Sequence, residues 1–305
     1  MSGGANLLSD PRAVAGLAER IVRASEGLSQ RITLMEVCGT HTQAIAAAGL
    51  RRLLPPTVRL ISGPGCPVCV TPVGYVDRAE ALAALPGLTV CTFGDLVRVP
   101  SSRGSLERAR AAGADVRVVY SPHDAVEFAR ANSDRRVVFL GVGFETTAPT
   151  IAAALDEAEL TGVRNFLVLS GHKIMPPPMR VLAADPEVRV QGFLLPGHVS
   201  VITGGAAFRF LTEEFNLGGV VVGFTPTDVL AGILELVEQA IAGRPRVVNL
   251  YGRAVTDGGN AVARSLLDRY FEPADVEWRG LGVIPGSGLA LRQEWRRRDA
   301  GLIPV

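Results

Sequence analysis

The chain has 305 residues, of which 48% are hydrophobic and 20% charged, and this balance excludes a disordered protein and a coiled coil. Its 31 basic and 30 acidic residues nearly cancel, so the composition indicates neither nucleic acid nor a membrane surface as the main partner. No secretory signal pattern opens the chain, and Pro226, Asp228 and Glu235 interrupt its longest apolar region, 217–237. We therefore expect a soluble cytoplasmic protein.

Short apolar runs alternate with longer segments rich in Ala, Leu and Glu. Several of these runs are continuous rather than alternating, which is typical of parallel strands covered on both faces. The alternation predicts βαβ units with right-handed crossovers. In chain order, strands are predicted at 32–37, 58–62, 89–92, 116–120, 137–142, 165–170, 190–195, 219–222 and 246–250, with helices at 76–85, 106–112, 150–160 and 228–242.

Two stretches of the chain resemble each other. C-G-T-H-T-Q-A-I-A-A-A at 38–48 and F-E-T-T-A-P-T-I-A-A-A at 144–154 each follow a predicted strand, and each is followed by a strand that ends in Ser-Gly. Two alanine-rich helices could match by chance, but the paired Ser-Gly favours a duplicated α/β unit. We predict an α/β fold with two similar parallel-sheet domains, 1–123 and 124–250, that face a cleft. A C-terminal extension, 251–305, is expected to pack back on them.

The chain has four cysteines, too few for a disulfide scaffold in a protein of this length. Cys38 lies in M-E-V-C-G-T-H-T, between a predicted strand and a predicted helix, where open α/β sheets place ligand sites. Backbone N–H groups at the helix start would favour its thiolate, and His41 could act as a base, a hydrogen-bond partner or a ligand. The alternative is a buried cysteine with a threonine capping the helix.

The stretch G-P-G-C-P-V-C has the C-x-x-C spacing of a reversible disulfide or of half a metal site. Its proline and the two preceding glycines would stiffen the turn and let a partner backbone approach closely. A zinc site at Cys66 and Cys69 would need two more ligands, for which Cys38 and His41 are available, so zinc stays an alternative to redox or iron chemistry. Cys91 lies in an apolar strand, which predicts a buried structural thiol.

Three polar loops follow predicted strands in the second half of the chain. They contain Glu145, His172 and His198, and we expect them to converge on one sheet edge as candidates for binding a ligand or a partner. Helix capping and loop hydrogen bonds are the structural alternative.

Long motifs in order along nearly the whole chain resemble those of the HypD family. They are M-E-V-C-G-T-H-T at 35–42, G-P-G-C-P-V-C at 63–69, F-G-D-L-V-R-V-P at 93–100, G-F-E-T-T-A-P at 143–149, G-H-K-I-M-P-P at 171–177, P-G-H-V-S at 196–200 and R-G-L-G-V-I-P-G-S-G-L at 279–289.

The resemblance implies an assembly scaffold with thiol redox activity, on which the Fe(CN)2CO group of NiFe hydrogenase is built, rather than a conventional turnover enzyme. The implied partners are a HypC-type chaperone and a HypE-type protein that supplies cyanide. Carried over by motif, Cys38 is the iron-binding thiolate, shared with the chaperone, and Cys66 and Cys69 are the redox-active dithiol. His41 and Glu145 match positions assigned to the same cleft.

The chain departs from the family pattern in two respects. Family members continue into a segment whose four cysteines hold a 4Fe-4S cluster, whereas no cysteine follows Cys91 here. We expect no 4Fe-4S cluster in this chain, which is either truncated or a divergent member reduced by an outside donor. Thr225 is a smaller departure, since the family usually has an acidic residue there.

Two other functions stay open on the sequence. A stand-alone dithiol oxidoreductase would exchange disulfides without iron or partners. A zinc-stabilised interaction protein would contain stoichiometric zinc and lose stability when the metal is chelated.

Overall fold

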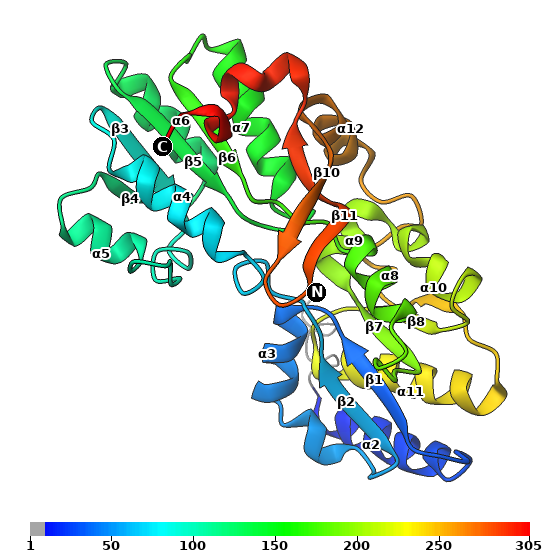
Figure 1. Ribbon diagram of the computed structural model, residues 1–305. Coiled ribbons are helices and arrows are strands. Elements are labelled where there is room, and N and C mark those ends of the chain that lie inside the picture. The colour runs from blue at the N-terminus through cyan, green and yellow to red at the C-terminus, as the bar shows by residue number, and fades with distance from the viewer. Residues whose placement is uncertain (1–9) are drawn as a thin grey trace. The chain divides into compact units, whose positions relative to one another are not determined.

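The computed structural model describes residues 10–305, and their contacts divide the chain into two compact units (Figure 1). Unit 1 consists of the residues up to Cys66 together with Pro178–Ala261, and unit 2 consists of Pro67–Pro177 and Val262–Val305. Each unit is an α/β structure built on a parallel sheet, as predicted.

Unit 1 is built on a five-stranded sheet, sheet A, in the order β2-β1-β7-β8-β9, and every neighbouring pair in it is parallel. Its strands are β1 (Ile32–Glu36), β2 (Val58–Ser62), β7 (Gly192–Pro196), β8 (Gly218–Val222) and β9 (Val247–Asn249). The helices are α2 (Pro11–Ser25), α3 (Gly39–Ala47), α9 (Gly197–Thr203), α10 (Phe210–Glu213) and α11 (Pro226–Ala242), with the short 3-10 turns η1 (Leu50–Leu53) and η2 (Gly205–Phe208).

Helices α2, α3 and α11 form one hydrophobic core with sheet A. Ile21, Ile45 and Ile233 come from these helices and pack with Leu34 and Val220 of the strands. Thr225 begins α11 as its N-cap, because its hydroxyl accepts the N–H of Asp228 while the Asp228 carboxylate accepts the N–H of Thr225. The threonine that departs from the family pattern therefore has a structural task.

Unit 2 is built on a four-stranded parallel sheet, sheet B, in the order β4-β3-β5-β6. Its strands are β3 (Leu88–Thr92), β4 (Val116–Val118), β5 (Arg136–Gly141) and β6 (Phe166–Ser170). The helices are α4 (Val73–Ala83), α5 (Leu106–Ala111), α6 (Pro122–Ala131), α7 (Ala148–Leu160) and α12 (Ala261–Tyr270). The first residue of α12 belongs to unit 1, and helix α8 (Pro176–Ala184) begins in unit 2 and ends in unit 1. The chain ends in the antiparallel hairpin β10 (Phe271–Trp278) and β11 (Gly282–Leu291), followed by η3 (Gln293–Arg298) and η4 (Ala300–Leu302).

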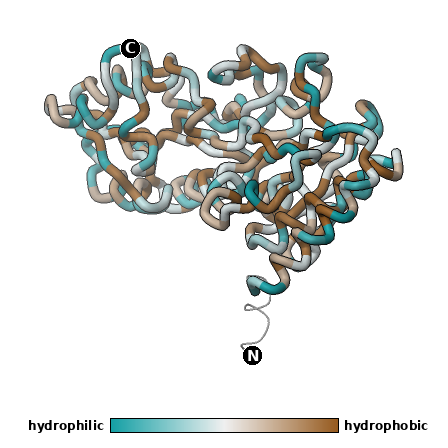
Figure 2. The backbone as a smooth tube through the Cα atoms, turned by 90° about the horizontal axis from the view of Figure 1, so that it is seen from below, coloured by the Kyte–Doolittle hydropathy of each residue, from teal (hydrophilic) through white to brown (hydrophobic). Residues whose placement is uncertain are grey.

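Sheet B is covered on both faces, as its continuous apolar strands predict. Alternate residues of β5 belong to different cores: Phe139 packs in the core formed with α6 and α7, whereas Val138 and Leu140 pack in the core formed with α4. In Figure 2 brown apolar stretches alternate with teal ones along the chain, as this arrangement requires.

All nine predicted strands are present, to within two residues at each end. The hairpin of β10 and β11 was not predicted, because Pro273, Pro285 and several glycines break the alternating pattern. No helix within residues 10–305 is both long and apolar enough to cross a membrane.

The units do not follow the predicted division into 1–123, 124–250 and 251–305. Residue 123 lies inside unit 2, where β4 and β5 both pair with β3. Strands β7, β8 and β9 instead join β1 in sheet A, because β7 pairs with β1 across a long crossover. Most of the predicted C-terminal extension belongs to unit 2.

Candidate functional site

Cys38 lies at the carboxyl end of β1 and is the N-cap residue of α3, in extended conformation. Its sulfur is half-buried and makes no hydrogen bond that caps α3. Burial raises the pKa of this thiol, and the N–H groups of His41 and Thr40 at the start of the helix, with the Thr40 hydroxyl, offset part of that rise. The group is therefore a thiol at neutral pH, and its place at the helix N-terminus favours a thiolate when a soft metal displaces the proton.

Glu36, which the sequence analysis did not select, fixes the turn that carries Cys38. Its carboxylate is fully buried and accepts the Cys38 N–H at 3.1 Å and the Thr42 hydroxyl at 2.6 Å. A buried carboxylate in an otherwise apolar strand was the available signal, since such a group needs hydrogen-bond partners nearby.

The backbone of the G-P-G-C segment lies directly against the Cys38 turn. Gly39 donates its N–H to the Gly65 carbonyl at 2.8 Å, and a Cβ atom on Gly65 would lie 2.3 Å from the Cys38 nitrogen. Only glycine permits this approach. The glycine segment thus admits a close backbone contact, but the backbone is that of this chain's own Cys38 turn, and the expected approach of a partner backbone stays a prediction.

His41 is fully buried and neutral. Its Nε2–H donates to the Gly223 carbonyl at 3.0 Å, and burial lowers the pKa of the ring to about 4. Because a carbonyl can only accept, the proton is on Nε2 and Nδ1 is left as an acceptor, with no partner among residues 10–305. The ring lies 4.8 Å from the Phe224 ring, which stacks at 3.8 Å on the exposed His198. His198 therefore lies at the same edge of sheet A as His41.

Cys66 and Cys69 are joined by a disulfide, so the C-x-x-C motif is in its oxidised form. The turn is closed by Thr71, whose hydroxyl donates to the Pro67 carbonyl at 2.8 Å. Cys91 is fully buried, as predicted, and burial raises its pKa to about 12, so it is an inert thiol.

Glu145, in unit 2, follows β5 and is buried. One carboxyl oxygen accepts the Met175 N–H at 2.8 Å, and the other has no hydrogen-bond partner among residues 10–305. Burial raises the pKa of Glu145 to about 7, so the group can hold or release a proton at neutral pH.

His172 follows β6 and is also buried and neutral, since burial lowers its pKa to about 3. The Ser170 hydroxyl donates to the Leu289 carbonyl at 2.5 Å, so the ring Nδ1–H must donate to the Ser170 oxygen, 3.0 Å away. Nε2 then has a free lone pair and no partner within the described chain. Leu289 and Phe271, which contacts the ring edge-on, both come from the hairpin.

The hairpin also contacts Lys173, which follows His172 in the chain. This side chain is buried, donates to the Glu277 carbonyl at 2.9 Å and lies over the ring of Trp278. Burial lowers its pKa to about 8. The Trp278 N–H is in turn accepted by the buried Ser287 hydroxyl at 2.8 Å. The hairpin, which the sequence did not reveal, thus covers the loop after β6.

The three polar loops do not converge on one sheet edge, and that prediction is wrong. The loop of His198 follows β7 in sheet A, whereas those of Glu145 and His172 follow β5 and β6 in sheet B. Sheet membership depends on which strands pair across long crossovers, and no local pattern encodes this. The predicted site residues divide into Cys38, His41, Cys66 and His198 in unit 1 and Cys69, Glu145 and His172 in unit 2.

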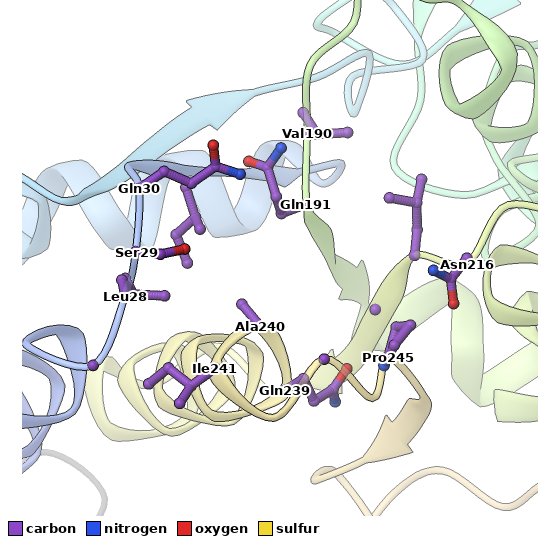
Figure 3. Close-up of a pocket in the computed structure, with 15 residues that line it drawn as sticks. Leu28, Ser29, Gln30, Val190, Gln191, Asn216, Gln239, Ala240, Ile241 and Pro245 are labelled. Atoms are coloured by element: carbon purple, nitrogen blue, oxygen red, sulfur yellow. The ribbon is translucent and has the colours of Figure 1, made fainter.

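The opposite edge of sheet A has a cavity of about 320 Å³, at the amino ends of β1, β7 and β8 (Figure 3). Gln30, Gln191, Asn216 and Gln239 line it, and none of its lining residues is ionisable. It therefore offers no acid, base or thiol for chemistry.

One further cluster could accept a metal ion. The ligand atoms of His123, Glu127 and Glu157 lie within 4.8 Å of one another, but Arg130 already pairs with both carboxylates. This exposed group is better described as an ion-pair network on α6 and α7.

Comparison with known proteins identifies the family. The family model HypD, described as "Hydrogenase formation hypA family", matches residues 12–303. The chain belongs to the HypD family. It is similar to the hydrogenase maturation factor HypD of Escherichia coli (strain K12), with 46% identity over 285 residues, 93% of this chain and 76% of that protein. It is also similar to hydrogenase maturation factor HypD of Rhodobacter capsulatus, 44% identical over 95% of this chain and 78% of the relative, and to that of Rhizobium leguminosarum bv. viciae, 48% identical over 87% and 71%.

The HypD match includes both sheet edges and the hairpin. The chain is accordingly a hydrogenase maturation factor of the HypD family.

Proposed function

We propose that this HypD-family protein holds iron through Cys38 while the Fe(CN)2CO group of NiFe hydrogenase is assembled. The observation that carries the proposal is the Cys38 turn: a half-buried thiol at the N-terminus of α3, in a loop fixed by Glu36. Iron that carries cyanide and carbonyl is a soft ion that prefers thiolate, and the partial positive charge of the helix N-terminus favours the deprotonated ligand.

In this proposal a HypC-type chaperone supplies a second thiolate and a HypE-type protein supplies cyanide, in the cytoplasm. The protein acts as a scaffold, with iron as its cargo. His41 and His198 border the Cys38 edge of sheet A and are candidates for contacts with the cargo or the chaperone.

The second part of the proposal concerns the Cys66–Cys69 disulfide as an electron reservoir. Reduction breaks the S–S bond and takes up two electrons and two protons to give two thiols, and reoxidation returns them. An outside donor supplies these electrons in our proposal. The buried Glu145, with a pKa near 7, is a candidate proton donor and acceptor for such steps.

The test is anaerobic co-expression with a HypC-type partner, followed by metal analysis and infrared spectroscopy of the purified complex. We expect about one iron per complex, with cyanide and carbonyl stretching bands that disappear in Cys38→Ala. Cys91→Ala is the matched control, because that thiol is buried in the core of unit 2 and should leave the bands unchanged. A stable complex of the wild-type protein without iron or these bands would contradict the proposal.

A stand-alone dithiol oxidoreductase is the second candidate, favoured by the disulfide at Cys66 and Cys69. It predicts disulfide exchange with small dithiols and unrelated substrates at the same rate with and without iron and partners. The zinc alternative predicts one zinc per chain, and it requires Cys66 and Cys69 as reduced ligands rather than as the disulfide seen here.

A further inference from the structure

The turn of the β10–β11 hairpin lies against the residue that follows the dithiol motif. The backbone N–H of Arg279 donates to the carbonyl of Val70 at 2.8 Å, and Val70 is buried and adjacent to Cys69 in the chain. Arg279, Val70 and Cys69 all belong to unit 2. This contact places the backbone of Arg279 next to Val70, the residue that directly follows Cys69 of the disulfide.

No carboxylate among residues 10–305 forms an ion pair with the half-buried Arg279. Its Nε and Nη2 atoms are buried, and neither has a hydrogen-bond partner in the same part of the chain. These two nitrogens form one side of the guanidinium, the pair of parallel N–H donors that binds an anion. Arginine keeps its charge at any accessible pH, so an anion that forms near this donor pair is stabilised by it.

Other arginines show how such donors are normally satisfied in this protein. Arg298 is buried, and it bonds the Glu159 carboxylate and the carbonyls of Val163 and Phe166. Arg253 forms a bidentate ion pair with the Asp228 carboxylate. Arg279 differs from both in that its donors are buried without an acceptor.

The position of Arg279 indicates which anion it serves. Its two unmatched nitrogens are closed to solvent, so an external anion would have to open the structure to reach them. The charge can instead act through space on an anion that forms inside the protein near Arg279. The disulfide is uncharged, but on reduction it can take up two electrons from a dithiol reductant and only one proton, which gives one thiol and one thiolate.

We propose that Arg279 is a positioning residue for the dithiol, whose positive charge stabilises the thiolate of Cys69 in the reduced protein and so sets how easily the disulfide is reduced. The inference rests on the proposed redox role of Cys66 and Cys69, and it adds the hairpin to the machinery of that step. A positive charge near a thiolate stabilises the reduced form, and its removal must favour the disulfide.

The experiment measures the thiol–disulfide equilibrium of the purified full chain in dithiothreitol redox buffers, without iron or partners. Alkylation and mass spectrometry of the peptide that contains Cys66 and Cys69 report the reduced fraction. We expect Arg279→Gln to shift the equilibrium about tenfold towards the disulfide, a fall in midpoint potential of about 30 mV. The pH at which the reduced pair is half alkylated by iodoacetamide should rise by about one unit.

Two further variants separate the charge from the fold. Arg279→Lys keeps the positive charge but not the paired donors, so its midpoint should lie between those of the wild type and Arg279→Gln. Arg103→Gln removes one exposed positive charge from the same unit and should leave the midpoint unchanged.

Equal midpoints and alkylation profiles in the wild type and Arg279→Gln would overturn the role of Arg279 while leaving the wild-type dithiol established. A shift towards the dithiol in Arg279→Gln would also overturn it, because loss of a stabilising charge has the opposite sign. A wild-type disulfide that no dithiothreitol buffer reduces would refute both this inference and the proposed redox function.

Discussion

The carboxyl edges of sheets A and B occupy the same topological position, yet they differ in how they are covered. At the edge of sheet A, Cys38 is half-buried and His198 is exposed. At the edge of sheet B, Glu145, His172 and Lys173 are all buried, and strands of the C-terminal hairpin contact the last two. The end of a parallel strand is therefore a place where a site can form, and the segments that return to it decide whether its groups meet solvent.

The two edges also share a structural feature. Each has a neutral buried histidine whose protonated nitrogen is committed to an oxygen acceptor: His41 to the Gly223 carbonyl and His172 to the Ser170 hydroxyl. Each therefore has one free lone pair within the described chain. The following predictions test how far this similarity extends, from the largest expected effect to the smallest.

The close approach of the two cysteine segments in unit 1 should be the most sensitive feature. Gly65→Ala places a methyl group 2.3 Å from the Cys38 nitrogen, against backbone that cannot move without disturbing the turn. We expect unit 1 to lose about 3 kcal/mol or more of unfolding free energy. Hydrogen exchange of β1 and β2 in urea measures it.

The matched control is Gly74→Ala, in α4, where an added Cβ meets nothing within 4 Å. It should leave stability unchanged or raise it slightly, since alanine favours the helix. Equal stabilities for Gly65→Ala and the wild type would show that the Cys38 turn is not held by this contact.

The second prediction concerns the neutral His172. Its folded pKa of about 3 lies below the ordinary histidine value of 6.5, so its contribution to stability is fully present above pH 6.5 and is lost as the pH falls. Relative to His172→Asn, the wild type should lose about 3 kcal/mol between pH 6.5 and 4. Both tryptophans, Trp278 and Trp295, belong to unit 2, so fluorescence during urea unfolding follows this unit.

His198→Gln serves as the comparison at the edge of sheet A. Its ring is exposed and partial burial lowers its pKa, so His198→Gln should reduce the loss of stability at low pH in the same direction as His172→Asn but by a smaller amount. If His172→Asn and the wild type showed parallel curves, His172 would not be buried as a neutral ring.

The contribution of Glu145 to the free energy of unfolding should depend on pH in the opposite direction. Its folded pKa of about 7 lies above the ordinary glutamate value of 4.5, so its contribution to stability is present below pH 4.5 and is lost as the pH rises through 7. Relative to Glu145→Gln, the wild type should lose about 2 kcal/mol between pH 5 and 6.5. Because His172 gains over the same range, the two effects partly cancel in the wild type, and only the variants reveal them.

The smallest expected loss of stability concerns a contact inside the β10–β11 hairpin. Ser287→Ala removes the acceptor of the buried Trp278 N–H and should cost unit 2 about 1–2 kcal/mol, because the indole donor is left without a partner. Exposed Ser133→Ala is the control and should have no effect. A loss for Ser287→Ala no greater than for the control would show that this contact does not hold the hairpin over Lys173.

Much of this protein could be predicted from its sequence. Short β-rich runs located all nine predicted parallel strands, and several of them are continuously apolar because a strand covered on both faces is apolar at every position. The C-x-x-C spacing allowed a disulfide or half a metal site at Cys66 and Cys69, and the structure has the disulfide. The apolar strand around Cys91 predicted its burial.

The tertiary structure decided the rest. Which sheet a strand joins depends on pairing across long crossovers, so β7 and its His198 loop joined β1 rather than the strands of Glu145 and His172. The hairpin hides Lys173 and brings Arg279 to Val70, although more than a hundred residues separate each from its contact along the chain. Local pattern encodes which residues form strands and turns, whereas burial, and with it the pKa of each buried group, is set by segments that are distant in sequence.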